Sequence, residues 1–292
     1  MYKKKILLTG SGGMLGSRVF QELLLNPAYT VFTVGRVSRG ENSFACDLSD
    51  PIAFADVLES VAPDIVIHCA ANVNLGSCER EKAYTYGLHV LSSRLIASRK
   101  SIQRSIFIST DSVFDGLEGN YTEKSAVTPL NYYALTKALG EECFFNASHA
   151  ALVIRTNIIG FNSPLNSSLF EWAWENLAAG KKITGYKNVF FNPLYVGTLA
   201  KIIIQLLNSS LTGVVHTGCR EGLSKYEFIR KIAEVFELPL DNISGSELDV
   251  SEGEIRRPLN TILATRNVEN LLGIEMPDIT AELMAIKRDS RK

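Results

Sequence analysis

A glycine-rich turn between the first predicted strand and the first predicted helix constrains the fold most. The apolar run I-L-L-T at 6–9 precedes G-S-G-G-M-L-G and an amphipathic segment that reaches about Leu25. A tight turn, close approach to a pyrophosphate and close helix packing each exclude a Cβ atom, and the helix N-terminus offers free N–H groups to an anion. The turn therefore predicts a doubly wound parallel α/β sheet that binds a dinucleotide. The residues expected at this ligand are Gly10, Gly13, Met14, Leu15 and Gly16.

The end of the second predicted strand bears on the choice of cofactor. The run Y-T-V-F-T-V at 29–34 ends in Gly35-Arg36, and no carboxylate that would hold the ribose hydroxyls of NAD appears before Glu41. Arg36, with Arg39 nearby, is suited instead to the 2′-phosphate of NADP. The alternative is a solvated surface arginine in a polar loop. We expect NADP(H) rather than NAD(H).

The stretch 109–137 contains the side chains of a hydride-transfer site. Tyr133 and Lys137 are four apart in a segment rich in helix formers, so both project from one helix face. A phenol with a pKa of about 10 is a poor acid or base at neutral pH, and a nearby ammonium lowers that pKa. Thr110 ends the run I-F-I-S-T, at the strand edge where open α/β sheets bind ligands. By spacing alone, Tyr133 and Lys137 would equally form an ordinary helix-surface pair.

This stretch resembles the extended short-chain dehydrogenases/reductases, and within them the dTDP-4-dehydrorhamnose reductase family. The family carries S-T-D-[YFS]-V-F-D-G followed by P-x-N-x-Y-[GA]-x-[ST]-K, which read S-T-D-S-V-F-D-G and P-L-N-Y-Y-A-L-T-K here. The resemblance implies a Rossmann-type sheet with a smaller C-terminal substrate lobe. The dinucleotide-binding domain would comprise residues 1–160 and about 189–217. The substrate lobe would comprise about 161–188 and 218–292.

The resemblance also implies roles for individual residues. Tyr133 would donate the proton, Lys137 would tune it and hold the nicotinamide ribose, and Thr110 would hydrogen-bond the substrate oxygen, with Ser109 as the alternative. Further residues implied at the cofactor are Asp47, Leu48, Ala70 and Ala71, and those implied at the substrate are Asp111, Arg256 and Arg257. The two arginines suit the diphosphate of a nucleotide sugar, although a solvated loop would hold them equally well. No metal site is expected.

Some positions depart from the family pattern or need a separate interpretation. His89 lies in a helix expected over about 79–99, where relatives commonly have an Asn. Ile158 lies where relatives often have a Trp near the nicotinamide. His68 lies within an apolar strand, so we expect a hydrogen-bonded core histidine rather than a ligand.

Two tryptophans lie in the segment 161–187, which is expected to be a helix. Trp172 and Trp174 are two residues apart, and side chains at this spacing cannot share a helix face. At least one is therefore expected to pack between the lobes or between the protomers of a homodimer.

Composition argues against several classes of protein. The net charge of -1 provides no electrostatic basis for binding nucleic acid. No window approaches the ~18 apolar residues of a membrane span, and the apolar run near the N-terminus is too short for a signal peptide. The five cysteines are scattered without a C-x-x-C pair, which is typical of reduced thiols. We therefore expect a cytoplasmic protein without nucleic-acid or membrane partners.

Three functions stay open on this evidence. The resemblance implies an NAD(P)-dependent oxidoreductase that reduces the 4-keto group of a nucleotide-linked deoxysugar, as in dTDP-rhamnose biosynthesis. It extends equally to the non-catalytic, NADP-binding regulatory subunit of methionine adenosyltransferase. The third is a nucleotide-sugar epimerase or dehydratase, but dehydratases that resemble this fold use an Asp-Glu pair after the Thr, and this chain has Asp111-Ser112. The intact Thr110, Tyr133 and Lys137 favour the reductase.

Overall fold

The computed structural model describes residues 3–162, 168–249 and 255–290. At its centre is a seven-stranded sheet in which all neighbouring strands are parallel. In spatial order the strands are β11 (Gly213–Thr217), β6 (Ala150–Thr156), β5 (Arg104–Thr110), β4 (Ile65–His68), β1 (Lys4–Thr9), β2 (Tyr29–Gly35) and β3 (Ser43–Ala45). The order runs outward in both directions from β1 and β4, which confirms the predicted doubly wound, Rossmann-type sheet.

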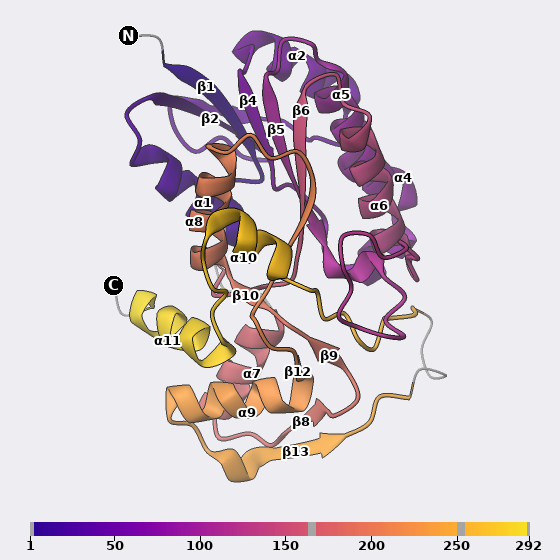
Figure 1. Ribbon diagram of the computed structural model, residues 1–292, viewed down its shortest axis with the longest axis vertical. Coiled ribbons are helices and arrows are strands. Elements are labelled where there is room, and N and C mark those ends of the chain that lie inside the picture. Colours follow the sequence, from indigo (N-terminus) through magenta and orange to yellow (C-terminus); the bar gives the residue numbers. More distant parts are fainter. Residues whose placement is uncertain (1–2, 163–167, 250–254, 291–292) are drawn as a thin grey trace.

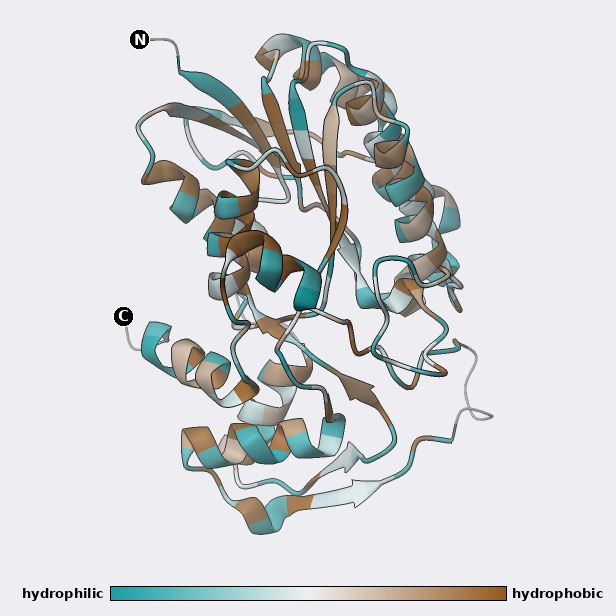
Figure 2. Cartoon of the chain, viewed as in Figure 1, coloured by the Kyte–Doolittle hydropathy of each residue, from teal (hydrophilic) through white to brown (hydrophobic). Residues whose placement is uncertain are grey.

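The inner strands are apolar on both faces, as expected for a parallel sheet that is covered on both sides. Ile6, Leu7 and Leu8 of β1 are fully buried, and so are Val66 and Ile67 of β4. Figure 2 shows the inner strands as mostly hydrophobic, whereas the surrounding helices alternate between polar and apolar residues. Burial of continuous apolar runs therefore holds the sheet in the interior.

Helices cover both faces of the sheet (Figure 1). Ile6 and Leu8 face one layer, which consists of α1 (Met14–Leu24) and α8 (Val196–Leu207). Leu7 faces the other layer, which consists of α2 (Pro51–Val61), α5 (Ser92–Ser98) and α6 (Tyr132–Phe145). The alternation of neighbouring β1 side chains between two cores places both helix layers against one sheet.

The segment expected to be one helix over about 79–99 is broken in the structure. Its elements are α3 (Leu75–Arg80), α4 (Lys82–Tyr86), the π-helical turn η1 (Gly87–Leu91) and α5. Gly87 packs so closely on Ser49 that an added Cβ would lie 2.7 Å from the Ser49 carbonyl oxygen. The hydroxyls of Ser92 and Ser93 donate to carbonyl oxygens four residues earlier, an interaction that bends helices. Both contacts favour the irregular turn, and apolar periodicity does not reveal either.

A further layer of short elements lies beyond the carboxyl edge of the sheet (Figure 1). Its members are η2 (Asp111–Val113), β7 (Ile158–Ile159), α7 (Leu169–Ala178), β8 (Ile183–Tyr186), β9 (Phe190–Phe191), β10 (Leu194–Tyr195), β12 (Leu223–Ser224), α9 (Lys225–Phe236), η3 (Leu240–Asn242) and β13 (Ile243–Ser246). The paired strands are β7 with β10, β9 with β12, and β8 with β13. The last helices are α10 (Arg266–Leu272), which contacts β11, and α11 (Ile279–Asp289), which contacts α9.

The helix expected within 161–187 is shorter than predicted. Residues 163–167 lie outside the described part of the chain, α7 accounts for ten residues, and 183–186 form β8. Pairing with β13, about 60 residues further along the chain, explains the strand. Trp174 packs edge-on against Phe161, with ring centroids 5.1 Å apart, whereas Trp172 is 37% exposed. The division into a dinucleotide domain and a substrate lobe stays a prediction.

A buried ion pair joins α6 to β6. The Arg155 guanidinium donates to both carboxylate oxygens of Glu141, with a shortest distance of 2.6 Å, and the two side chains are only 3% and 2% exposed. Ser109 of β5 donates its hydroxyl to the same carboxylate. The Arg155 guanidinium also lies over the Phe114 ring, 5.2 Å from its centroid. One carboxylate therefore ties α6 to two neighbouring strands.

Replacing Arg155 by Met should lower the free energy of unfolding by about 3–5 kcal/mol, because it leaves the Glu141 carboxylate buried without its cation. Denaturant unfolding followed by circular dichroism measures this loss. The double variant Arg155→Met with Glu141→Gln should be less destabilised than the single variant. A single variant within about 1 kcal/mol of the wild type would contradict the structural role of the pair.

Candidate active site

The glycine turn lies at the carboxyl end of β1, where it meets the end of β4. Gly10 has φ +70°, and a Cβ added there would lie 2.7 Å from the backbone nitrogen of Ala70. A Cβ at Gly16 would collide with the Gly10 carbonyl group. Gly13 is the N-cap of α1, so the helix has no side-chain cap, and its first turn contains no acidic residue. The free N–H groups and the missing Cβ atoms make this turn suitable for a phosphate.

The other residues predicted at the dinucleotide differ in how far they are buried. Leu15 is 5% exposed and belongs to the hydrophobic core, so only its backbone can face a ligand. Met14 is partly buried and packs against the same core. Ala70 and Ala71 are partly buried directly after β4. All of them flank the crevice between β1 and β4, the point where strand order reverses and where such sheets bind ligands.

His68 is a hydrogen-bonded core histidine, as predicted. It is fully buried, and its Nδ1 lies 2.7 Å from the hydroxyl of Thr9 while its Nε2 lies 3.1 Å from that of Ser92. Burial lowers the pKa of His68 to about 3. The Thr9 hydroxyl also accepts the backbone N–H of Ala70. His68 therefore fixes the ends of β1 and β4 relative to each other.

The basic loop after β2 lies beside the glycine turn. Arg36 and Arg39 are both exposed. A Cβ added at Gly12 would lie 3.1 Å from the Arg39 guanidinium carbon, so Arg39 covers the turn itself. Asp47 is exposed and accepts the backbone N–H of Ser49, whereas Leu48 is buried in the core. Both predicted arginines are thus accessible to a ligand at the turn.

Tyr133, Thr110 and Lys137 converge at the carboxyl end of β5. The hydroxyl of Thr110 is a hydrogen-bond partner of the Tyr133 phenol. The Lys137 ammonium, 2% exposed, donates to the Ile108 carbonyl oxygen at 2.6 Å and lies 3.9 Å from the centroid of the Phe107 ring. Ser109, the alternative to Thr110, is occupied by Glu141 and is not directed to Tyr133. The structure thus brings the three predicted catalytic residues together.

Burial governs the protonation of the tyrosine and the lysine. Desolvation raises the pKa of Tyr133 above its ordinary value, and the Thr110 hydroxyl opposes this more weakly. Desolvation lowers the pKa of Lys137 to about 7, against the favourable charge of Glu141. Loss of hydration dominates the pKa of Tyr133, and the Lys137 ammonium is directed to a backbone carbonyl. The lowering of the phenol pKa by Lys137 stays a prediction.

His89 packs against the ring of Tyr133. Its Nε2 accepts the backbone N–H of Asn72 at 2.9 Å, which places the ring proton on Nδ1, 2.8 Å from the Thr136 hydroxyl oxygen. Burial lowers the pKa of His89 to about 2, so the ring is neutral. Its ring meets that of Tyr133 edge-on, with centroids 5.9 Å apart. His89 is therefore a packing partner with a fixed tautomer.

Asp111 joins the catalytic strand to two distant segments. It is 2% exposed, and its Oδ1 accepts the hydroxyls of Thr110 and Ser112. Its Oδ2 accepts the Asn157 amide at 2.8 Å and the Thr261 hydroxyl at 2.6 Å. All four donors are uncharged, so the carboxylate is hydrogen-bonded without a direct ion pair. Asn157 and Thr261 were not predicted at the site, because nothing in a linear pattern relates them to Asp111.

Arg256 and Arg257 lie at the rim of this site. Both are exposed, and the backbone carbonyl of Arg256 accepts the side-chain amide of Asn131 at 3.0 Å. Asn131 also caps α6, two residues before Tyr133, by accepting the backbone N–H of Ala134. The C-terminal arginines are therefore anchored next to the helix that carries Tyr133.

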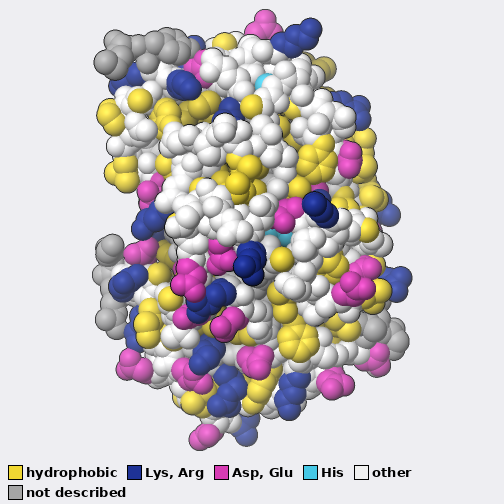
Figure 3. Space-filling view, in the orientation of Figure 1, with side chains coloured by type: hydrophobic (Ala, Val, Ile, Leu, Met, Phe, Trp, Pro, Cys, Tyr) yellow, Lys and Arg dark blue, Asp and Glu magenta, His cyan; other side chains and the backbone are white. Residues whose placement is uncertain are grey.

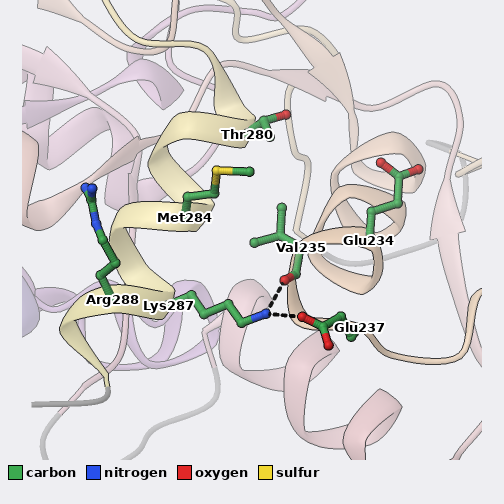
Figure 4. Close-up of a pocket in the computed structure, with 7 residues that line it drawn as sticks. All are labelled: Glu234, Val235, Glu237, Thr280, Met284, Lys287 and Arg288. Atoms are coloured by element: carbon green, nitrogen blue, oxygen red, sulfur yellow. Dashed lines mark hydrogen bonds and ion pairs between the residues drawn. The ribbon is translucent and has the colours of Figure 1, made fainter.

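A separate groove lies between α9 and α11 (Figure 4). Its lining residues are Glu234, Val235, Glu237, Thr280, Met284, Lys287 and Arg288. Lys287 crosses it to the Val235 carbonyl and the Glu237 carboxylate, both at 2.7 Å. None of these residues was predicted at the site. Within the described ranges, no cluster of three or more His, Cys, Asp or Glu is suited to a metal, and no helix is long and apolar enough to span a membrane.

Comparison with known proteins identifies relatives over nearly the full length. Methionine adenosyltransferase 2 subunit beta of Danio rerio is 28% identical over 282 residues, which cover 94% of this chain and 86% of that protein. The probable low-salt glycan biosynthesis reductase Agl14 of Haloferax volcanii is 27% identical over 291 residues, 96% of each.

A solved structure shares the fold. The crystal structure of dTDP-4-dehydrorhamnose reductase from Bacillus anthracis in complex with NADP superimposes with a TM-score of 0.86 at 24% identity, over 98% of this chain and 99% of that one. The family described as the RmlD substrate binding domain matches residues 4–291. The predicted resemblance is thereby confirmed. The chain belongs to this family, the dTDP-4-dehydrorhamnose reductase-like group of extended short-chain dehydrogenases/reductases.

Proposed function

We propose that this protein is a reductase that uses NADPH to reduce the 4-keto group of a nucleotide-linked deoxysugar. The observation that carries the proposal is the convergence of Thr110, Tyr133 and Lys137 at the carboxyl edge of the sheet, on the same edge as the glycine turn. Similarity to the Haloferax volcanii reductase supports the enzymatic interpretation. The domain division predicted from the sequence would place the cofactor on 1–160 and 189–217 and the sugar on the remainder.

The residues present fit a nicotinamide dinucleotide. The uncapped start of α1 and the close approach at Gly10 suit a pyrophosphate. By the family resemblance the exposed Asp47 would meet the adenine, and Arg36 and Arg39 suit the 2′-phosphate of NADP. The Bacillus anthracis structure contains NADP, which supports the same choice here.

In this proposal the side chains divide the chemistry among them. The cofactor supplies the hydride to the ketone carbon. Thr110 donates a hydrogen bond to the ketone oxygen, and Tyr133 transfers its phenolic proton to that oxygen as the alcohol forms. Lys137 stabilises the resulting phenolate and holds the nicotinamide ribose. The raised pKa of Tyr133 suits this role, because the phenol stays protonated at neutral pH until the oxygen develops charge.

The second candidate function is a non-catalytic regulatory subunit. Its support is the 28% identity to methionine adenosyltransferase 2 subunit beta. A dehydratase is disfavoured, since Ser112 follows Asp111 where a carboxylate pair is needed. Incubating the protein with dTDP-, UDP- and GDP-linked 4-ketosugars and following NADPH absorbance separates the candidates. Turnover supports the reductase, whereas tight NADPH binding without any turnover supports the regulatory subunit.

Tyr133→Phe should abolish turnover of the ketosugar, because the proton donor is lost while the ring and its contact with His89 stay. Its dissociation constant for NADPH should remain within about twofold of the wild type, since a hydrogen bond here is replaced at little cost in packing. Steady-state rates and fluorescence titration provide the two measurements. Undiminished turnover in this variant would remove Tyr133 from the mechanism.

At least one of the variants Arg36→Ala and Arg39→Ala should weaken NADPH binding by roughly 1.5–3 kcal/mol, the range of a hydrogen bond to a charged group, and barely affect NADH binding. The comparison of the two variants identifies which arginine binds the 2′-phosphate. Lys100→Ala, distant in sequence from this loop, serves as the control. Equal losses for both cofactors would mean that the arginines support the loop rather than bind the phosphate.

Lys137→Met should weaken cofactor binding and suppress turnover together, because the ammonium serves both the ribose and the phenolate. A regulatory subunit would show only the first loss. Titrations with NADPH and rate measurements on the same protein sample distinguish the outcomes. Full activity in the Met variant would contradict the proposed role.

Lys137 should also make stability depend on pH. Its pKa is about 7 in the folded protein and 10.5 in its ordinary state, so between these values the unfolded chain binds more protons. The free energy of unfolding of the cofactor-free protein should therefore rise with pH from about 7 to 10.5, at up to about 1.4 kcal/mol per pH unit. Below pH 7 the cost of burying the charge is fully present. Denaturant unfolding of Lys137→Met at several pH values should lack this rise, and an identical rise would assign it to other groups.

A further inference from the structure

Lys225 is held at the same rim as the predicted substrate residues, although no sequence motif marks it. It begins α9 immediately after β12, which pairs with β9. Its backbone N–H donates to the Val189 carbonyl oxygen at 2.8 Å. Its ammonium lies over the Phe191 ring, 3.1 Å from the centroid. The backbone hydrogen bond therefore fixes the main chain of Lys225, and the face of the Phe191 ring stabilises its ammonium by a cation–π interaction.

The segment that carries Arg257 is hydrogen-bonded to strand β9. The Phe190 N–H donates to the Leu259 carbonyl oxygen at 2.6 Å, and the Thr261 N–H donates to the Phe190 carbonyl oxygen at 2.9 Å. Thr261 in turn donates to Asp111, which follows Thr110. The end of β5, strand β9 and the Arg257 segment are therefore held together by a continuous series of hydrogen bonds.

The charge of the Lys225 ammonium is not neutralised by a contact. Within the described part of the chain, no residue accepts a hydrogen bond from it. Burial lowers the pKa of Lys225 to about 7, while Asp111 raises it and Arg257 lowers it. The Asp111 oxygens already accept four neutral donors. Lys225 therefore lies within electrostatic reach of one carboxylate, whose oxygens already accept hydrogen bonds, and of a second cation, Arg257.

This arrangement is local rather than part of a broad basic field. Figure 3 shows Lys and Arg side chains interspersed with Asp and Glu over the end of the molecule that carries α9. Mixed charge of this kind attracts a polyanion weakly at long range. An anion that binds here must instead make contacts with the two cations themselves.

We propose that Lys225 and Arg257 bind the diphosphate of the nucleotide sugar, with Lys225 on the phosphate that carries the sugar. Lys225 is assigned to that phosphate by its position. The charged group that affects it most is Asp111, which directly follows Thr110, whereas Arg257 is exposed at the outer rim. The proposal rests on the proposed function and adds a residue from α9 to its substrate site. It gives the sugar one orientation, with the reacting ring toward Tyr133 and the nucleoside toward solvent.

The test compares ligands with and without the diphosphate. Calorimetric titration of the NADPH-saturated protein with dTDP, UDP, GDP and thymidine measures the phosphate contribution directly. Lys225→Met keeps the apolar stem over Phe191 and should weaken binding of the preferred nucleoside diphosphate at least tenfold, with no change for thymidine. Lys225→Arg should retain most of the affinity. Lys231→Met is the matched control, because Lys231 lies on the same helix and pairs with Glu234 on the surface.

Each outcome decides the proposal. Wild-type affinity for the nucleoside diphosphate in Lys225→Met overturns it, and so does a wild-type protein that binds none of dTDP, UDP and GDP. If Lys225→Met does not fold, Arg257→Gln replaces it, with the same tenfold loss expected and wild-type affinity again counting against the pair. Turnover of a ketosugar that needs Tyr133 but not Lys225 would overturn this inference and leave the proposed function intact. Diphosphate binding that needs Lys225 without any turnover would support the inference and overturn the reductase.

Discussion

The buried ion pair between Glu141 and Arg155 is the interaction on which the geometry of the site depends. It holds α6, the helix of Tyr133 and Lys137, against β6, and through Ser109 against β5, which ends in Thr110. Burying two charges costs several kcal/mol per ion unless both are fully hydrogen-bonded. The bidentate contact and the serine hydroxyl meet that condition. The helix of Tyr133 and the strand that ends in Thr110 are therefore held by the same ion pair.

Asp111 connects the end of β5 to the segments at the rim of the site. Its four hydrogen bonds bring Asn157 and Thr261 to the end of β5, and Thr261 brings the Arg257 segment with it. Lys225 approaches from α9, so the rim combines segments that are separated by more than 100 residues. In a doubly wound sheet, all strands end at one edge, and loops from distant parts of the chain can meet there. The edge of the sheet brings these loops together, and specific hydrogen bonds determine which residues lie at the site.

Local patterns predicted the elements well where one interaction dominates. The continuous apolar runs of β1 and β4 are buried on both faces, and the turn at Gly10 requires the positive φ that glycine adopts freely. Prediction failed where tertiary contacts override periodicity. The irregular turn at His89 arises from packing on Ser49 and from serine hydroxyls, and β8 exists because β13 pairs with it.

The sequence by itself determined the class of fold, the glycine turn and the candidate set Thr110, Tyr133 and Lys137, because each depends on residues close together in the chain. Only the tertiary structure decided their electrostatics. Burial, a property of the whole fold, raises the pKa of Tyr133 and lowers that of Lys137, and helical spacing alone indicates neither effect. The tertiary structure also brought Lys225 within electrostatic reach of Asp111 and Arg257, since such proximity between distant segments leaves no pattern in a linear sequence.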